Sequence, residues 1–243
     1  MRVGTKQGGK GGRPRKFDED EVLLRLQRRL WSAGLSGVTL DGLARAAGIN
    51  RPSLAASFGD KDAIYARAIA HYAAMMADRI GHALDADDLR RALGDAFDAA
   101  IEVYTADGPD GCFVFSTAPA EAATDPACRA RLARIIDAID AQFLARLARE
   151  EAGSGRDDLP ALAGMLGATL QSIGLRARAG WRPDRLRAFA APVTDLVAGA
   201  LGGASGRASG GAATRPRAKR NKPTRDAPLT PPPRRAPASR SRS

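Results

Sequence analysis

The sequence predicts an all-α protein of about nine helices, in which a three-helix helix-turn-helix domain precedes a larger helical domain. Hydrophobic residues make up 44% of the 243 residues and aromatic residues only 5%, so the core must consist mostly of alanine and leucine, which suit packed helices. Apolar residues also recur at three- and four-residue spacing through most of residues 17–202. That spacing places them on one face of each helix.

The net charge of +11 is concentrated at the two ends of the chain. Residues 1–16 contain six Lys or Arg and no acid, and residues 203–243 contain eleven Lys or Arg and one Asp. These ends carry +6 and +10, which leaves −5 on residues 17–202. Both ends are too rich in Gly, Pro and charge to fold alone, so we expect disordered basic arms, which either lie along DNA or serve only as solvated tails. An acidic body argues against non-specific coating of nucleic acid, whereas basic arms add attraction to phosphates.

The first helix is expected to begin at Asp18 or Glu19, where acidic side chains suit the helix dipole, and to end at Gly34. It packs across the helix-turn-helix at residues 39–58 and completes a domain of residues 17–77. Its apolar face consists of Val22, Leu23, Leu26, Leu30 and Trp31.

The helix-turn-helix joins two short helices through a tight turn. Thr39 and Asn50 can cap these two helices, and Gly48 ends the first one. Leu54 and Phe58 are four residues apart and form the buried stripe of the second helix.

The stretch GINRPSLAASFGDKDAIY at residues 48–65 resembles the second and third helices of the tetracycline-repressor (TetR) family of transcriptional regulators. The chain departs from the family pattern at Ala55, where Tyr is usual, and at Ser57, which is often His. Over the rest of the chain, to about Leu201, the resemblance rests on the number and size of the helices. The matching residues are Thr39, Leu43, Ala44, Ala47, Gly48, Ile49, Ser53, Leu54, Phe58, Lys61, Asp62 and Ile64.

The resemblance implies that the second helix of the helix-turn-helix, which follows Asn50, enters the major groove of DNA. There the bases differ in their donors, acceptors and methyl groups. Arg51 would then contact a guanine and Pro52 a thymine methyl group. Ser53, Thr39 and Lys61 are expected at phosphates, which fix position rather than sequence. With Ala55 in place of Tyr, we expect one phosphate contact to be absent and the basic arms to compensate. The expected DNA-binding residues are Thr39, Arg51, Pro52, Ser53, Ala55, Ala56, Ser57 and Lys61.

Six further helices are expected after the helix-turn-helix. The segment 112–121 starts with the apolar run Cys-Phe-Val-Phe, which is also compatible with a strand. We interpret it as a helix because Gly-Cys before a buried helix that ends in Ala-Glu resembles one branch of the TetR family. The expected spans are about 61–82, 87–105, 112–121, from 124–126 to 153–155, 159–173 and 186–201.

Residues 78–202 are, by the same resemblance, a regulatory domain that binds a small-molecule effector and forms a homodimer. Dimerisation is expected through residues 159–201, although these apolar stripes would also suit an ordinary core. The candidate pocket residues have the same alternative, since each could be a core residue. They are Phe97, Ile101, Tyr104, Phe113, Phe115, Met165 and Gln171.

Other classes of function have little support in the sequence. We find no Gly-rich phosphate loop, no nucleophile elbow and no cluster with metal-ligand spacing, so we expect no enzyme, catalytic residue, cofactor or metal. Cys112 and Cys128 are sixteen residues apart and are expected to be packing residues, with redox sensing as the alternative. No secretory signal or membrane-spanning run is present, so a cytoplasmic protein is expected.

The expected function is therefore a sequence-specific regulator, by family habit a repressor. It would bind a palindromic operator as a homodimer and be released by a small molecule. The alternative is an architectural nucleic-acid-binding protein that acts through its basic arms with little sequence preference.

Overall fold

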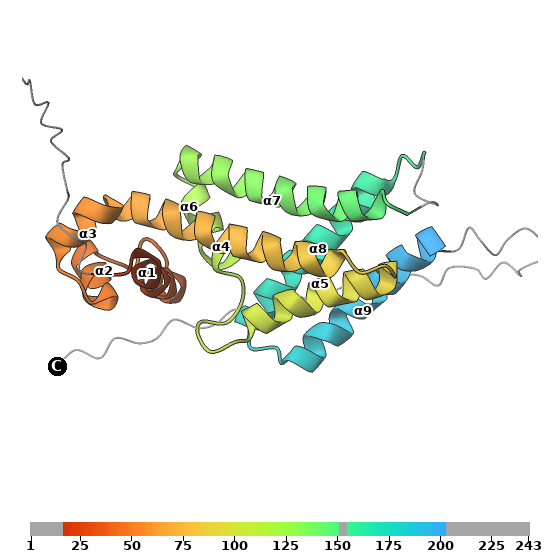
Figure 1. The fold of residues 1–243 in the computed structure, drawn as a ribbon, viewed down its shortest axis with the longest axis horizontal. Helices are drawn as coiled ribbons and strands as arrows, with labels where there is room; N and C mark the ends of the chain where they lie inside the picture. The colour runs from red at the N-terminus through yellow and green to blue at the C-terminus, as the bar shows by residue number, and fades with distance from the viewer. Residues whose placement is uncertain (1–16, 151–154, 203–243) are drawn as a thin grey trace, which may run out of the picture. The chain divides into compact units, whose positions relative to one another are not determined.

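The computed structural model describes residues 17–150 and 155–202, and within these ranges the chain forms nine α-helices and no strand (Figure 1). The predicted all-α class is therefore confirmed. The predicted basic arms, residues 1–16 and 203–243, lie outside the described residues. In chain order the helices are α1 (Glu19–Ala33), α2 (Leu40–Ala47), α3 (Arg51–Phe58), α4 (Lys61–Leu84), α5 (Leu89–Tyr104), α6 (Phe113–Ala122), α7 (Pro126–Leu147), α8 (Leu159–Arg178) and α9 (Pro183–Gly202).

Polar side chains placed just before the helices determine where six of them begin. Each accepts a hydrogen bond from a backbone N–H of the first helical turn. Such a cap typically contributes about 1 kcal/mol. The starts predicted for α1, α2 and α3 are confirmed. The capping residues are Asp18, Thr39, Asn50, Asp60, Asp88 and Asp125.

The turn between α2 and α3 depends on Gly48, which has a left-handed backbone conformation with φ of 72°. Its N–H and that of Ile49 donate to the last carbonyl groups of α2, so the helix ends with its acceptors satisfied. A residue with a side chain at this φ costs about 1–2 kcal/mol. Gly48 therefore fixes the angle at which α3 leaves α2.

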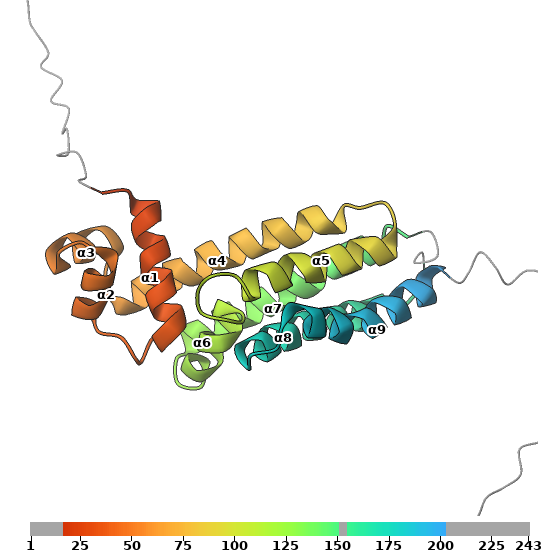
Figure 2. The ribbon, with the colours of Figure 1, turned by 90° about the horizontal axis from the view of Figure 1, so that it is seen from below.

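The first three helices form the head of the molecule, and α5 to α9 form its body. Helix α4 belongs to both, because it packs on α1 as well as on α5 and α7. The domain boundary predicted between residues 77 and 78 falls inside this continuous helix and stays a prediction. Helix α6 forms where the sequence left a strand open, and it contacts α1, α4, α7 and α8. Figure 2 shows α8 and α9 side by side, and they pack on each other and on α5.

Two glycines of α8 allow other segments to approach its backbone closely. A Cβ at Gly167 would overlap the carboxylate of Asp140 on α7, and a Cβ at Gly174 would come within 2.9 Å of the Cβ of Cys112. These small residues are therefore used in packing within the chain, at α7 and at the start of α6.

We predict opposite effects for alanine at two glycines of different geometry. Gly48→Ala should lower the free energy of unfolding by about 1–2 kcal/mol, because the side chain is strained at positive φ. The matched control Gly94→Ala should raise it by about 0.5–1 kcal/mol, since a Cβ there meets nothing within 4 Å and alanine favours the interior of α5. Urea unfolding of both variants measures this. Equal shifts of the same sign would contradict the assigned turn.

Candidate functional site

Helix α3 presents a short polar face to solvent because its apolar side chains point inward. Leu54 is fully buried and Phe58 is nearly so, which anchors α3 on the head. The Asn50 side chain accepts the N–H of Ser53 at 2.8 Å and fixes the first turn. The exposed residues of this helix are Arg51, Pro52, Ala55 and Ala56, and the half-buried ones are Ser53 and Ser57. All six were predicted from the sequence as DNA-binding residues.

Two arginines hold the head together around α3. The Arg67 guanidinium of α4 lies 4.6 Å from the centre of the Phe58 ring and pairs with Glu19 of α1 at 3.1 Å. Arg25 of α1 pairs with Glu21 and donates to the carbonyl of Ala47 at 3.2 Å, at the end of α2. Arg25 therefore connects α1 to the end of α2, and Arg67 connects α4 to α1. These contacts explain why arginine occurs at both positions.

The predicted base-reading residue, Arg51, has a partner within the chain. Its Nη1 lies 3.2 Å from a carboxylate oxygen of Asp41 on α2, and about 60% of each side chain is exposed (59% and 61%). An exposed pair of this kind contributes only about 0–1 kcal/mol. Arg51 can therefore exchange Asp41 for another hydrogen-bond acceptor at little cost. Sequence reasoning missed Asp41. It lies ten residues before Arg51, and such a spacing predicts no contact unless the geometry of the turn between α2 and α3 is known.

The two predicted phosphate residues outside α3 flank it on either side. The Thr39 hydroxyl oxygen accepts the N–H of Gly42 at 3.1 Å, so its O–H remains available as a donor. Lys61 is half-buried, and its ammonium donates to the carbonyl of Leu35 at 3.1 Å. An ammonium has three donors, so this contact to the α1–α2 loop leaves two.

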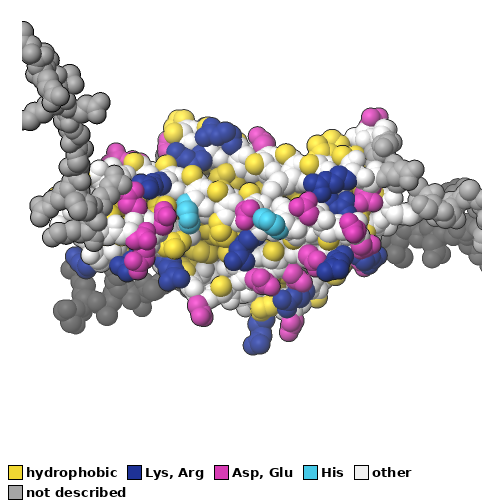
Figure 3. Space-filling view, viewed as in Figure 1, with side chains coloured by type: hydrophobic (Ala, Val, Ile, Leu, Met, Phe, Trp, Pro, Cys, Tyr) yellow, Lys and Arg dark blue, Asp and Glu magenta, His cyan; other side chains and the backbone are white. Residues whose placement is uncertain are grey.

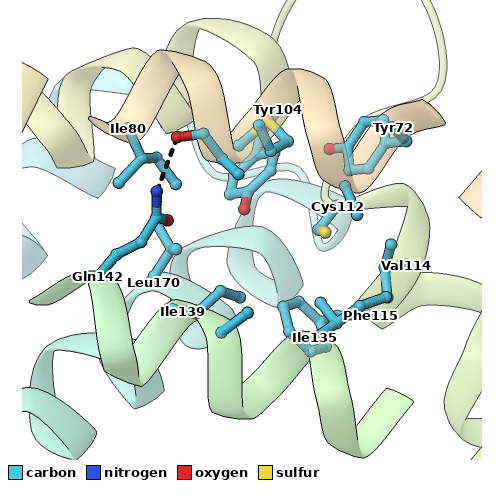
Figure 4. A pocket seen from close by; sticks show the side chains of 14 residues that line it. Tyr72, Ile80, Tyr104, Cys112, Val114, Phe115, Ile135, Ile139, Gln142 and Leu170 are labelled. Carbon is cyan, nitrogen blue, oxygen red and sulfur yellow. Dashed lines mark hydrogen bonds between the residues drawn. The ribbon is translucent and has the colours of Figure 1, made fainter. Parts of the chain in front are cut away.

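A cavity of 320 Å³ lies in the body, mainly between α4 and α7, with contributions from α5, α6 and α8 (Figure 4). This volume is at the lower end of the range of about 300–1,000 Å³ that is typical of small-molecule sites. The lining is almost entirely apolar and contains no charged side chain. The lining residues are Tyr72, Ala73, Met76, Ala77, Ile80, Tyr104, Cys112, Val114, Phe115, Ile135, Ala138, Ile139, Gln142 and Leu170.

Only two of the seven predicted pocket residues, Tyr104 and Phe115, line this cavity. Phe97, Ile101 and Phe113 are buried in the core instead, and Phe97 packs on Phe143 at 6.0 Å between ring centres. Met165 is 41% exposed on α8, and Gln171 lies half-buried outside the cavity. The sequence prediction selected large apolar residues but had no means of choosing which helix face borders the cavity.

Sequence reasoning missed the contributions of α4 and α7. Ile135, Ile139 and Gln142 of α7 remain only partly buried, although the first two belong to the apolar stripe of that helix. The amide of Gln142 donates to the carbonyl of Ala77 on α4 at 2.9 Å, and Figure 4 shows this bond beside the cavity. A glutamine within an apolar stripe was the available signal.

Three polar groups meet at one end of the cavity, and all remain neutral. Burial raises the pKa of the Cys112 thiol, and burial likewise raises the pKa of the Tyr72 and Tyr104 hydroxyls above their ordinary values. At neutral pH the thiol is therefore not a thiolate, and both phenols retain their protons. Both cysteines are free and buried.

An aromatic cluster of Trp31, Tyr72 and Phe113 connects the head to this cavity. The Trp31 ring of α1 lies 5.3 Å from Tyr72 of α4 and 5.9 Å from Phe113 of α6, and the last two are 5.7 Å apart. Tyr72 also lines the cavity, and Phe113 follows the lining residue Cys112. One wall of the cavity is therefore directly in contact with α1.

The described ranges offer little for other chemistry. Among those residues, no three His, Cys, Asp or Glu side chains are arranged to bind a metal ion. No helix in the same ranges has the length and apolar character required to cross a bilayer. On the face shown in Figure 3, Lys and Arg side chains are interspersed with Asp and Glu, so this face has no extended field of one sign.

The fold and site define a helix-turn-helix protein with a separate helical body. The profile of bacterial regulatory proteins of the tetR family matches residues 27–68, from α1 into α4. The HTH-type transcriptional repressor ComR of Escherichia coli (strain K12) is 30% identical over 108 residues, which are 43% of this chain and 51% of ComR. The match thus spans about half the length of that curated relative.

Solved structures extend the likeness beyond the head. CifR, a TetR family transcriptional regulator solved as a cysteine mutant with 26-base-pair operator DNA, is 28% identical with a TM-score of 0.67, covering 75% of this chain and 98% of CifR. A TetR-family regulator from Streptomyces coelicolor has a TM-score of 0.65 at 14% identity, over 75% of this chain and 95% of its own, which shows the fold alone. Residues 27–68 of this chain therefore match the tetR family of bacterial regulatory proteins, and the solved structures share its fold over about three quarters of its length.

We predict that Asp41→Asn strengthens binding to duplex DNA by about 2–10-fold. The substitution frees Arg51 and removes a negative charge close to it, and the gain should shrink as salt rises from 50 to 200 mM. Fluorescence anisotropy with a labelled duplex measures this. The control Asp107→Asn removes an exposed acid from the α5–α6 loop and should leave affinity unchanged. Weaker binding by Asp41→Asn would contradict a DNA-facing Arg51.

Proposed function

We propose that this protein is a transcription regulator that binds a two-fold symmetric operator as a homodimer and is released from it by a small molecule. The observation that supports it best is the capped helix α3, whose exposed face combines Arg51 and Pro52 with small residues. A short side chain at Ala55 and Ala56 lets this helix approach the base edges closely. Arg51 then donates two hydrogen bonds to a guanine, and Pro52 contacts a thymine methyl group.

Repression is the mode of action we propose, in keeping with ComR, which is named a transcriptional repressor. Selection of bound duplexes from a random pool at moderate salt tests the proposal. A two-fold symmetric consensus supports it, and the absence of any consensus refutes it. The latter result would favour the alternative, an architectural protein that binds through its basic arms, with a steep salt dependence that removal of residues 203–243 abolishes.

A dimer is required because one helix reads only a few base pairs. Each good bidentate contact is worth about 1–3 kcal/mol of discrimination, too little to select one site in a genome. Two copies related by a two-fold axis double the readout and match a palindromic site. The proposal therefore needs a surface on which two copies meet.

Helices α8 and α9 offer that surface. Three of the four large apolar side chains that are exposed within the described ranges lie on these two helices, namely Met165 (41%), Leu175 (67%) and Leu196 (57%). We take these exposed side chains on two adjacent helices as part of the surface that a second copy covers. We propose that α8 and α9 of each copy pack on those of the other, through residues about 159–201.

Release follows if a ligand in the α4–α7 cavity prefers an arrangement of α4 that separates the two heads from adjacent half-sites. A preference of about 3 kcal/mol is enough to lower operator affinity more than about 100-fold. The cavity borders α4, which begins three residues after α3 ends, so a movement of α4 displaces the recognition helix.

We predict that Arg51→Ala abolishes selective operator binding while the dimer stays folded. Loss of one bidentate contact per half-site should reduce the preference for the operator over random duplex by at least about 10-fold. Footprinting on the selected operator, with circular dichroism for the fold, measures this. The control Arg91→Ala removes an exposed arginine of α5 whose partner, Asp95, lies on the same helix, and it should keep the footprint. A normal footprint for Arg51→Ala would refute the assignment.

We predict that Leu175→Glu converts the dimer to a monomer, because a carboxylate would be buried at the interface without a partner. Sedimentation velocity at micromolar concentration checks the mass. Leu24→Glu is the matched control, since Leu24 is 45% exposed on α1 and borders a groove formed by α1, α4, α5 and the α5–α6 loop. Should Leu175→Glu remain dimeric, the dimer must use another surface.

A further inference from the structure

The cavity between α4 and α7 has a chemical character that restricts its ligand. It borders no Asp, Glu, Lys, Arg or His side chain. An ionised group placed in such a site loses its hydration and gains no partner charge. A carboxylate, phosphate or ammonium ligand is therefore disfavoured, whereas apolar surface gains from burial against Ile, Leu, Met and Phe side chains.

One polar group in the wall has no hydrogen bond of normal geometry. The Tyr72 hydroxyl is buried beside the Cys112 thiol and the Phe113 backbone, which influence its pKa, but no acceptor among the described residues satisfies it at hydrogen-bond geometry. Figure 4 shows it directed from α4 towards Tyr104 and Cys112, at one end of the cavity. A buried hydroxyl without a partner is unfavourable, and an acceptor brought by a ligand would relieve this. A phenolic hydroxyl can donate and accept, but donation of its proton is the stronger of the two interactions, so an acceptor on the ligand satisfies it best.

The side-chain amide of Gln142, which also lines the cavity, does not compete for this role. The Gln142 side chain already donates to the Ala77 carbonyl and connects α7 to α4. Gln142 lies on α7, and Figure 4 shows it at the opposite end of the cavity from Tyr72. A ligand's polar group at the other end would therefore meet the Tyr72 hydroxyl, beside the Tyr104 hydroxyl and the Cys112 thiol.

We propose that this cavity takes an uncharged, mainly apolar small molecule with a carbonyl-type acceptor, to which the Tyr72 hydroxyl donates a hydrogen bond. The proposal deepens the proposed function, on which it rests, by stating the class of effector. Tyr72 is then the residue that senses the ligand's polar group. Because Tyr72 also contacts Trp31 of α1 at 5.3 Å, the hydrogen bond forms on a side chain that touches the head.

A series of probes with one ring system separates charge from shape. Full-length protein is titrated by isothermal calorimetry with 2-acetylnaphthalene, naphthalene, 2-naphthoate and 2-naphthylmethylammonium. We expect 2-acetylnaphthalene to bind most tightly, naphthalene more weakly, and the two ions at least about 100-fold more weakly than the ketone. Binding of either ion as tightly as the ketone overturns the proposal, and so does failure of the ketone to bind.

Substitution of Tyr72 tests the hydrogen bond. Tyr72→Phe should weaken 2-acetylnaphthalene by about 3–10-fold and leave naphthalene unchanged, since only the ketone has an acceptor. A merely structural role would instead change both probes equally. Tyr65→Phe is the matched control, because the Tyr65 hydroxyl is bonded to Thr117 at 2.8 Å and does not line the cavity. Equal ketone affinity in Tyr72→Phe and wild type overturns the assigned donor.

Operator binding without any probe is measured in parallel, so that two failures can be told apart. Protein that binds the selected operator but not the ketone retains the proposed DNA function and loses this ligand class. Protein that binds the ketone in a Tyr72-dependent way but selects no operator retains the ligand class and loses the proposed function.

Discussion

The packing of Trp31 against Tyr72 and Phe113 is the contact on which the rest of the structure depends. It brings one large ring from each of α1, α4 and α6 into a single cluster of edge-to-face and tilted rings. All three rings are buried, and burying large aromatic rings in this way contributes several kcal/mol. The sequence contains seven Phe, two Trp and three Tyr, so this cluster uses a quarter of its aromatic residues. It determines how the head meets the remaining helices.

Further bonds around this cluster tie the head to α6 and α8. The carboxylate of Glu121 at the end of α6 accepts from the hydroxyl of Ser36 at 2.9 Å and from its backbone N–H at 3.3 Å. Arg178 of α8 donates to the carbonyl of Trp31 at 3.4 Å and to that of Asp110 at 3.2 Å. The head thus has contacts to the segment on each side of Cys112 and Phe113. A change in that segment has a direct physical route to α1, through packed side chains rather than through the long axis of α4 alone.

The local structure could be read from the sequence largely because caps and glycines act over a few residues. Thr39, Gly48 and Asn50 each fix a helix end through bonds to their immediate neighbours, and the helix-turn-helix was predicted correctly. The lining of the cavity depends instead on which faces of α4 and α7 meet. Apolar periodicity cannot distinguish a face that borders a cavity from one that is fully packed, so Phe97 and Ile101 were assigned to the pocket and Tyr72 was not. The Arg51–Asp41 pair was missed for the same reason, because it forms only once α2 and α3 cross.

The charges around the helix-turn-helix bear on how this chain would bind DNA under the proposed function. Arg51 faces Asp41, Lys61 is bonded to a loop carbonyl, and residues 17–202 have a net charge of −5. Ala55 adds no hydroxyl where the family usually has a tyrosine. We propose that phosphate attraction comes mainly from the +6 of residues 1–16 and the +10 of residues 203–243. On this proposal the two parts of recognition are separate: the ends would supply affinity that depends on salt and not on sequence, and α3 would supply discrimination. A small shift of α3 would then remove selectivity while the charged ends kept the protein close to DNA.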